Sequence, residues 1–293
     1  MTAAAGRAGR VGLPLRPHVA VWQRRGTVRL IVIAVFGLTC AFPLAYMLSL
    51  SFSTLGGVLA PGLSVLPQHP TLANYAAAWT ENDFSGYFVN SVLVAAGAVA
   101  GTVILSALTA YGFARYEFRG RETLFYLMLA SLVVPATLLV LPQYVLMRDL
   151  GLLDSRIGLT LLYISSNIPF SVFLLRGFFE GIPKELPEAM RLDGVSELGI
   201  LTKLVLPLSK PALATVALFT FNGAWDEFVL ALTMINTSSK RTMPIAISLF
   251  QQTHSSAWGP FFAASVIATA PTVIVFAIAQ RWFQQGLSLG ALQ

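Results

Sequence analysis

Six long apolar runs constrain this chain more than any other feature of its sequence. Each run is 20 to 27 residues long. A helix of that length crosses ~30 Å of hydrocarbon and satisfies its own backbone hydrogen bonds where water is absent. The sequence therefore predicts an all-α polytopic membrane protein with six transmembrane helices. The predicted spans are Val28–Leu50, Tyr87–Phe113, Thr123–Met147, Ile157–Phe179, Ala212–Ile235 and Phe261–Gln280.

The distribution of charge supports this class. Charged residues make up 11% of the chain, where a soluble domain has about 25%. Eleven of the 13 acidic residues lie outside the apolar runs. The net charge of +6 is not gathered into a basic face interleaved with aromatic side chains, so nucleic acid is not an expected partner. Membrane lipid is.

Lysine and arginine predict the orientation. With the N-terminus in the cytoplasm, fifteen of these residues lie on the cytoplasmic side and four lie outside. This bias follows the positive-inside rule and places both termini in the cytoplasm. We expect residues 1–27 to form an N-terminal tail, residues 28–283 the six-helix domain, and residues 284–293 a C-terminal tail. The five arginines of the N-terminal tail fit an uncleaved signal anchor.

The loop over residues 180–211, between the fourth and fifth spans, is long and charged. Pro187 suits the first turn of a helix, where its missing amide costs nothing. Gly194 is a natural left-handed stop, and Ser196 can cap a second helix that ends before Pro207. The sequence therefore predicts two short helices in an L shape on the cytoplasmic face.

This loop resembles a motif of the permease subunits of ATP-binding-cassette (ABC) importers. The motif is Glu-Ala-Ala, three residues, glycine, nine residues, and Ile-x-Leu-Pro. Met190 replaces the second alanine and Leu204 replaces the isoleucine, and both substitutes are apolar. The resemblance implies that this loop couples to an ATPase. The coupling residues that it implies are Glu188, Ala189, Met190, Asp193, Gly194, Leu204, Leu206 and Pro207.

The resemblance extends to the sugar-uptake (maltose-type) branch of this family. Trp225-Asp226-Glu227-Phe228 is similar to its Trp-Asn-Glu-Phe segment, and residues 286–291 are similar to its glycine-rich tail. The resemblance implies half of a translocation path for a di- or oligosaccharide, or a related polyol or glycerol phosphate. It implies a bacterial plasma membrane location and four kinds of partner: a second permease subunit, two ATPase subunits, an extracellular substrate-binding protein and lipid.

The sequence offers no chemistry of its own. No G-x-x-x-x-G-K-[ST] phosphate loop is present, so we expect ATP and Mg²⁺ to be used by the partner ATPase and no cofactor to be bound here. The histidines His18, His69 and His254 are far apart, which argues against a metal site. No nucleophile and base are paired in any catalytic pattern, so the chain is not expected to be an enzyme.

Asp226 and Glu227 are the only acidic residues inside the predicted spans. An intramembrane carboxylate normally faces protein or a water-filled cavity. Together with Asn222 and Trp225, these residues suit the hydroxyls and C–H faces of a sugar and are the candidate substrate path. Two alternatives stay open: structural hydrogen bonds to a neighbouring helix, or a proton-coupled secondary transporter that uses Asp226 or Glu227.

Glycine and proline mark the packing of the spans. Gly97 and Gly101 give the second span a small-xxx-small face for close helix contact. Pro135 in the third span and Pro169 in the fourth each remove a backbone donor and kink the helix. Ordinary bending and a transport path explain these prolines equally well.

Overall fold

The computed structural model of this chain describes residues 18–54, 66–67, 69–80, 83–253 and 258–290, and this described part is helical with no strand. Four helices are long and apolar enough to cross a membrane. They confirm the first, second, fourth and sixth predicted spans. These helices are α1 (His18–Ser51), α4 (Phe84–Arg115), α7 (Arg156–Glu180) and α14 (Trp258–Gly290).

The third predicted span is a broken pair of helices and not one continuous helix. The pair is bent by 96° between Val133 and Ala136. Proline disfavours the α conformation of the preceding residue, and Val134 before Pro135 is accordingly extended, with ψ 120°. The elements are α5 (Arg121–Ala130), the 3₁₀ helices η2 (Ser131–Val133) and η3 (Ala136–Leu139), and α6 (Val140–Asp149).

The fifth predicted span is also interrupted. Helix α11 (Lys210–Trp225) ends one residue before Asp226, and α12 (Val229–Met234) begins three residues after it. A second bent pair, with an angle of 82°, joins the loop helices to α11. Counting each bent pair as one span gives up to six spans among the described residues, although the second pair joins the loop helices to α11 and does not coincide with the predicted fifth span.

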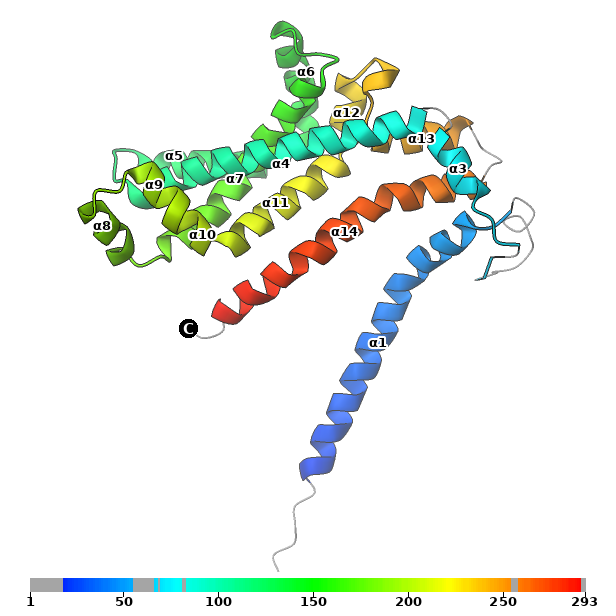
Figure 1. The fold of residues 1–293 in the computed structure, drawn as a ribbon, viewed down its shortest axis with the longest axis horizontal. Coiled ribbons are helices and arrows are strands. Elements are labelled where there is room, and N and C mark those ends of the chain that lie inside the picture. Colours follow the sequence, from blue (N-terminus) through cyan, green and yellow to red (C-terminus); the bar gives the residue numbers. More distant parts are fainter. Residues whose placement is uncertain (1–17, 55–65, 68, 81–82, 254–257, 291–293) are drawn as a thin grey trace, which may run out of the picture.

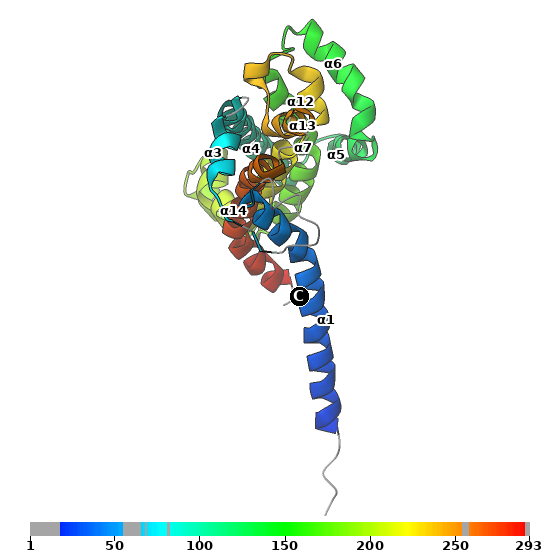
Figure 2. The same ribbon diagram turned by 90° about the vertical axis from the view of Figure 1, so that its right-hand side faces the viewer.

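The core is an elongated bundle. Figures 1 and 2 show α4, α7, α11 and α14 running along one another. Helix α1 diverges from them and approaches α14 only near the C-terminal end of α1. The small face of α4 packs on α7: a methyl group at Gly97 would lie 3.1 Å from Thr160 Cγ2, and one at Gly101 would overlap Ile164 Cδ1. The predicted close helix contact is therefore confirmed.

Short helices close both ends of the bundle (Figure 1). The loop end carries α8 (Glu185–Leu192), α9 (Glu197–Ile200), the π-helix η4 (Leu201–Val205) and α10 (Leu206–Leu208). The opposite end carries α3 (Ala73–Thr80), η5 (Ser238–Lys240) and α13 (Met243–Thr253), which the sequence did not predict. Helix α13 packs there because Met243 and Ala246 are buried in one cluster with Ala263 of α14.

Candidate functional site

The loop folds into the two short helices that the sequence predicts, α8 and α9, and the segment over residues 185–208 is called the hairpin below. Gly194 ends α8 with φ +78°, and its amide donates to the Arg191 carbonyl at 3.0 Å. Ser196 caps α9, with its hydroxyl accepting from the Gly199 amide at 3.3 Å. Pro187 lies in the first turn of α8, as expected, although the helix begins two residues earlier. The left-handed stop and the cap are therefore confirmed.

The second helix of the hairpin differs from the prediction that it ends before Pro207. It continues as the π-helix η4 and then as α10, which contains Pro207. The wide π turn is closed by the Leu206 amide, which donates to the Leu201 carbonyl. Pro207 then lies at the start of a new turn, where its missing amide breaks no hydrogen bond.

The coupling residues divide into two groups by exposure. Met190, Leu204 and Leu206 are partly buried and pack against the apolar cluster beneath the loop. The others point outward: Glu188, Ala189, Asp193, Gly194 and Pro207 are exposed. Leu192 is 90% exposed on the same hairpin. The loop therefore has an anchored inner side and an outer side available to another molecule.

A carboxylate that the sequence reading missed joins the hairpin to the bundle. Glu197 of α9 accepts from Tyr111 Oη of α4 at 2.7 Å and from Arg191 Nε of α8 at 2.5 Å. Three helices thus meet at one side chain. Only the Arg191–Glu197 pair, six residues apart, could have been suspected from the sequence, because Tyr111 lies 86 residues away.

Two arginines hold the same end of the bundle together. Arg176 of α7 is buried, pairs with Glu122 of α5 and Glu180 at 2.7 Å each, and lies over the Phe125 ring at 4.2 Å. Arg115, at the end of α4, donates to the Phe179 carbonyl at 2.6 Å. These contacts bridge α4, α5 and α7 where the loop begins.

The opposite end has one strong acceptor. Asp154 has φ +52°, and its carboxylate accepts from the Asn236 and Thr237 amides, the Thr237 hydroxyl and Lys240 Nζ, at 2.6 to 3.0 Å. The Thr237 hydroxyl and amide, followed by Lys240, hold the pKa of this carboxyl well below its usual range. This side chain fixes the segment after α12 to the start of α7.

The four candidate path residues have different surroundings. Trp225 is buried, and its Nε1 donates to the Ala268 carbonyl at 2.9 Å. Glu227 accepts from Tyr163 Oη at 2.9 Å and from the Leu230 and Ala231 amides at 2.8 and 2.9 Å.

The carboxylate of Glu227 thus caps α12 and bonds to α7, which agrees with the alternative that this residue makes structural hydrogen bonds to a neighbouring helix. Asn222 and Asp226 are exposed at the break between α11 and α12. Contact of any of these residues with substrate stays a prediction.

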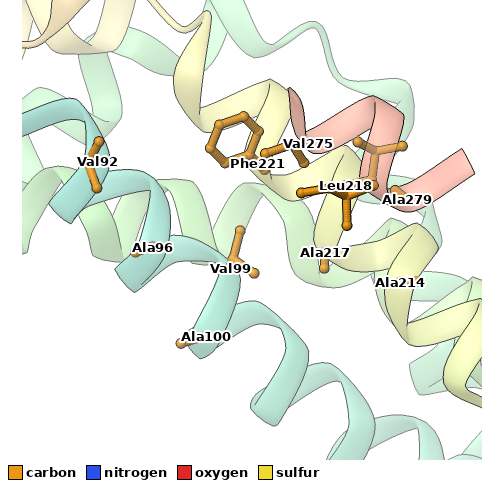
Figure 3. A pocket seen from close by; sticks show the side chains of 11 residues that line it. Val92, Ala96, Val99, Ala100, Ala214, Ala217, Leu218, Phe221, Val275 and Ala279 are labelled. Atoms are coloured by element: carbon orange, nitrogen blue, oxygen red, sulfur yellow. The ribbon is translucent and has the colours of Figure 1, made fainter. Parts of the chain in front are cut away.

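An apolar groove of about 510 Å³ runs between α4, α11 and α14 (Figure 3). Every side chain that lines it is a hydrocarbon, so it suits a lipid chain or another helix and offers nothing to a hydroxyl. The lining residues are Val92, Ala96, Val99, Ala100, Ala214, Ala217, Leu218, Phe221, Val275, Ile278 and Ala279.

A cavity of different character, about 460 Å³, lies at the break of the third span. It is bounded by the η2–η3 segment, α6, the middle of α7 and the start of α12. Three hydroxyls and an amide share its wall with apolar groups. The lining residues are Ser131, Leu132, Val134, Pro135, Ala136, Leu139, Gln143, Ser165, Ser166, Pro169 and Leu230.

An apolar helical bundle with broken central spans and a hairpin anchored at one end defines the membrane-embedded subunit of a transport system. Residues 102–289 match the family described as the binding-protein-dependent transport system inner membrane component. The chain belongs to this family. It is the permease subunit of an ABC importer, an integral membrane and non-enzymatic component, as the sequence predicted.

Curated relatives cover most of the chain. The diacetylchitobiose uptake system permease protein NgcG of Streptomyces coelicolor is 35% identical over 86% of this chain and 83% of its own length. The trehalose/maltose transport system permease protein MalG of Thermococcus litoralis is 34% identical over 88% of this chain and 94% of its own length. Nothing in these matches favours the proton-coupled alternative.

A solved structure shares the fold. A chain of a bacterial ABC transporter involved in the import of the acidic polysaccharide alginate superposes with a TM-score of 0.78 at 25% identity. The match covers 92% of this chain and all of that one. The predicted fold class is confirmed.

Proposed function

We propose that this chain forms half of the translocation path for a saccharide in the plasma membrane of a bacterium. The relatives NgcG and MalG are named for the uptake of diacetylchitobiose and of trehalose and maltose, which supports a di- or oligosaccharide as substrate. A related polyol or glycerol phosphate belongs to the same proposal. An extracellular binding protein delivers the substrate, and a second permease subunit supplies the other half of the path.

The anchored hairpin at the loop end carries this proposal. Its outer side presents Glu188, Asp193 and Leu192 to solvent. Its inner side is bonded to α4 through Glu197 and packs on an apolar cluster that includes residues of α7. A short helix held in this way moves with the bundle, so a push on α8 is transmitted to the membrane helices. One of the two ATPase subunits, which use ATP and Mg²⁺, docks on this outer side, and this chain binds neither ATP nor metal.

The orientation follows from the charge count. Both termini and the hairpin face the cytoplasm, where the ATPases are, and α3 and α13 face outward. Single cysteines at Ser196 and Ser238 test this with a membrane-impermeant thiol reagent applied to intact cells. Ser238→Cys should react and Ser196→Cys should not. The reverse pattern would overturn the orientation.

Uptake in cells that lack this chain tests the function. Radiolabelled maltose, trehalose and diacetylchitobiose should enter cells that carry the wild-type chain, and entry of at least one should stop without it. In the purified complex, substrate-stimulated ATP hydrolysis should fall in Gly194→Pro, because a proline ring cannot adopt φ +78°. It should also fall in Glu188→Lys, which reverses a charge at the start of α8.

Thr202→Ala is a matched control, since Thr202 is exposed on the same hairpin and its hydroxyl bonds only to α9 carbonyls. Wild-type stimulation in both Gly194→Pro and Glu188→Lys would remove the coupling role. Uptake by the purified chain alone, without ATP, would replace the importer proposal with a secondary transporter.

A further inference from the structure

We propose that the cavity at the break of the third span is a binding site for one uncharged, hydroxyl-rich sugar unit on its way through the membrane. The inference rests on the proposed function and narrows it, since it excludes glycerol phosphate and acidic sugars as cargo. Asp226 and Glu227 do not line the cavity, although Leu230, whose amide donates to Glu227, does.

The amide of Gln143 is the first observation. The side chain lines the cavity, and its Oε1 is buried without a hydrogen-bond partner among the described residues, as are seven other side-chain atoms. A buried carbonyl oxygen without a donor costs about 1–3 kcal/mol. Because solvent does not reach this oxygen, the proposal requires the amide to rotate into the cavity, where a sugar hydroxyl can donate to it.

The wall contributed by α7 adds further acceptors. Ser165 donates its hydroxyl to the Leu162 carbonyl, which leaves its oxygen lone pairs free to accept. Pro169 has no amide, so the Ser165 carbonyl lacks the donor that an ordinary residue at 169 would provide. Ser165 and Ser166 are both exposed near the middle of α7. The cavity is therefore rich in acceptors at membrane depth.

The break itself supports a polar occupant. Between α5 and α6 the chain leaves regular α-helix over Ser131–Leu139. Irregular backbone at membrane depth is stable only where protein covers it or where it lines a wet cavity. The break borders this cavity through Ser131 and Pro135. A transported polar solute and its water meet that requirement.

The wall also defines the charge and size of the occupant. None of the residues that line the cavity is charged, so a carboxylate or phosphate would enter without a cation to compensate it. Leu132, Leu139 and Leu230 give apolar surface that suits the C–H faces of a sugar ring. The volume of about 460 Å³ lies within the range of ~300–1,000 Å³ that is usual for small-molecule sites.

Transport kinetics of the purified complex in vesicles test the site. Gln143→Leu removes the acceptor at similar volume, and Ser166→Ala removes a hydroxyl at an exposed position. We expect each to raise the apparent KM for the transported saccharide by roughly 2- to 12-fold, the value of one lost hydrogen bond. Gln280→Leu, the same substitution at an exposed position far from the cavity, should leave KM unchanged.

Deoxy analogues of the transported saccharide separate contact from structure. In a series of analogues that each lack one hydroxyl, the analogue without the hydroxyl bound by Gln143 should be a poorer substrate of the wild type. It should lose nothing further in Gln143→Leu, because the partner of that hydroxyl is already gone. A structural role for Gln143 would penalise all analogues equally. If Gln143→Leu does not assemble, Ser166→Ala carries the same comparison.

The outcomes distinguish the two proposals. If the intact complex transports no saccharide, the proposed function fails, and this inference fails with it. Saccharide transport with unchanged KM and unchanged deoxy profiles in both variants would overturn the site alone. Transport of oligo-uronates in preference to maltose, trehalose and diacetylchitobiose would overturn the uncharged cargo, while the importer proposal would stand.

Discussion

The loop end and the break of the third span differ in how their polar side chains are partnered. At the loop end, Glu197 and Arg176 each bind two or more partners from different helices. At the break, Gln143 Oε1 is buried without a partner among the described residues, and Ser165 and Ser166 line a cavity. Polar groups that satisfy one another make a stiff element. The difference matches the two proposed roles, transmission of force at the loop end and binding of cargo at the break.

Both regions depend on the contact between α4 and α7, so breaking that contact has the largest expected effect. Gly101→Leu drives a side chain into Ile164 and should destabilise the fold by about 1–3 kcal/mol or more. We expect a much lower yield of monodisperse protein in detergent and a lower midpoint of thermal unfolding. Gly112→Leu on the same helix is the control, because nothing lies within 4 Å of its Cβ position. Equal stability of the two variants would contradict the close contact.

Glu227 tests whether every polar group in the centre awaits a ligand. Glu227→Leu leaves the Leu230 and Ala231 amides and Tyr163 Oη without an acceptor, which should cost about 1–3 kcal/mol of stability. Glu227→Gln keeps one acceptor and should cost less. Thermal unfolding of the purified protein measures both. A stable Glu227→Leu variant with a raised KM would instead move Glu227 to the substrate path.

The stiffness of the loop end can be measured through Tyr111 and Glu197. Tyr111→Phe removes the hydrogen bond to Glu197, worth about 1 kcal/mol, and Glu197→Gln weakens both that bond and the ion pair with Arg191. We expect fewer sugar molecules transported per ATP hydrolysed in either variant, and a double variant that loses little more than Glu197→Gln alone, because Tyr111→Phe acts on a contact that Glu197→Gln already weakens. Fully additive losses would show that the two side chains act separately. Binding of the saccharide should not change.

Asp226 should respond mildly to loss of its charge. We expect Asp226→Asn to retain substantial uptake, because an amide still bonds to hydroxyls and the resembling family segment carries asparagine there. Asp226→Leu should lose more. Uptake assays at fixed ATP with and without a proton gradient measure this. Abolished uptake in Asp226→Asn, with a rate that follows the proton gradient, would revive the secondary transporter.

The smallest expected effect is that of mild acid on the end opposite the loop. Because the pKa of Asp154 is lowered in the folded protein, its contribution is complete above the unfolded value of about 3.9 and is lost only as the pH falls toward the lowered value. Hydrogen exchange of residues 235–241, corrected for intrinsic rates, should therefore show equal protection at pH 7 and pH 5. Asp154→Asn should loosen this segment at both.

Local signals in the sequence determined the spans and the hairpin. An apolar run of about 20 residues has few options other than a membrane helix, and Gly194 and Ser196 act on their own backbone within three residues. The same local reasoning could not place the breaks in the third and fifth spans. Pro135 allows either a kink or a sharp bend, and the bend accompanies tertiary contacts of α5 with α7 and of α6 with α12, which the local sequence does not reveal.

The tertiary structure alone decided which polar residues are satisfied. Trp225 and Glu227 stand beside Asp226 in the sequence, yet their partners Ala268 and Tyr163 come from α14 and α7. Gln143 drew no attention in the sequence, and its interest comes from a buried Oε1 that has no hydrogen-bond partner among the described residues. Caps and apolar periodicity act over a few residues, whereas a hydrogen-bond partner or a cavity wall can come from any part of the chain. The sequence therefore determined the elements and the family, and the fold determined the site.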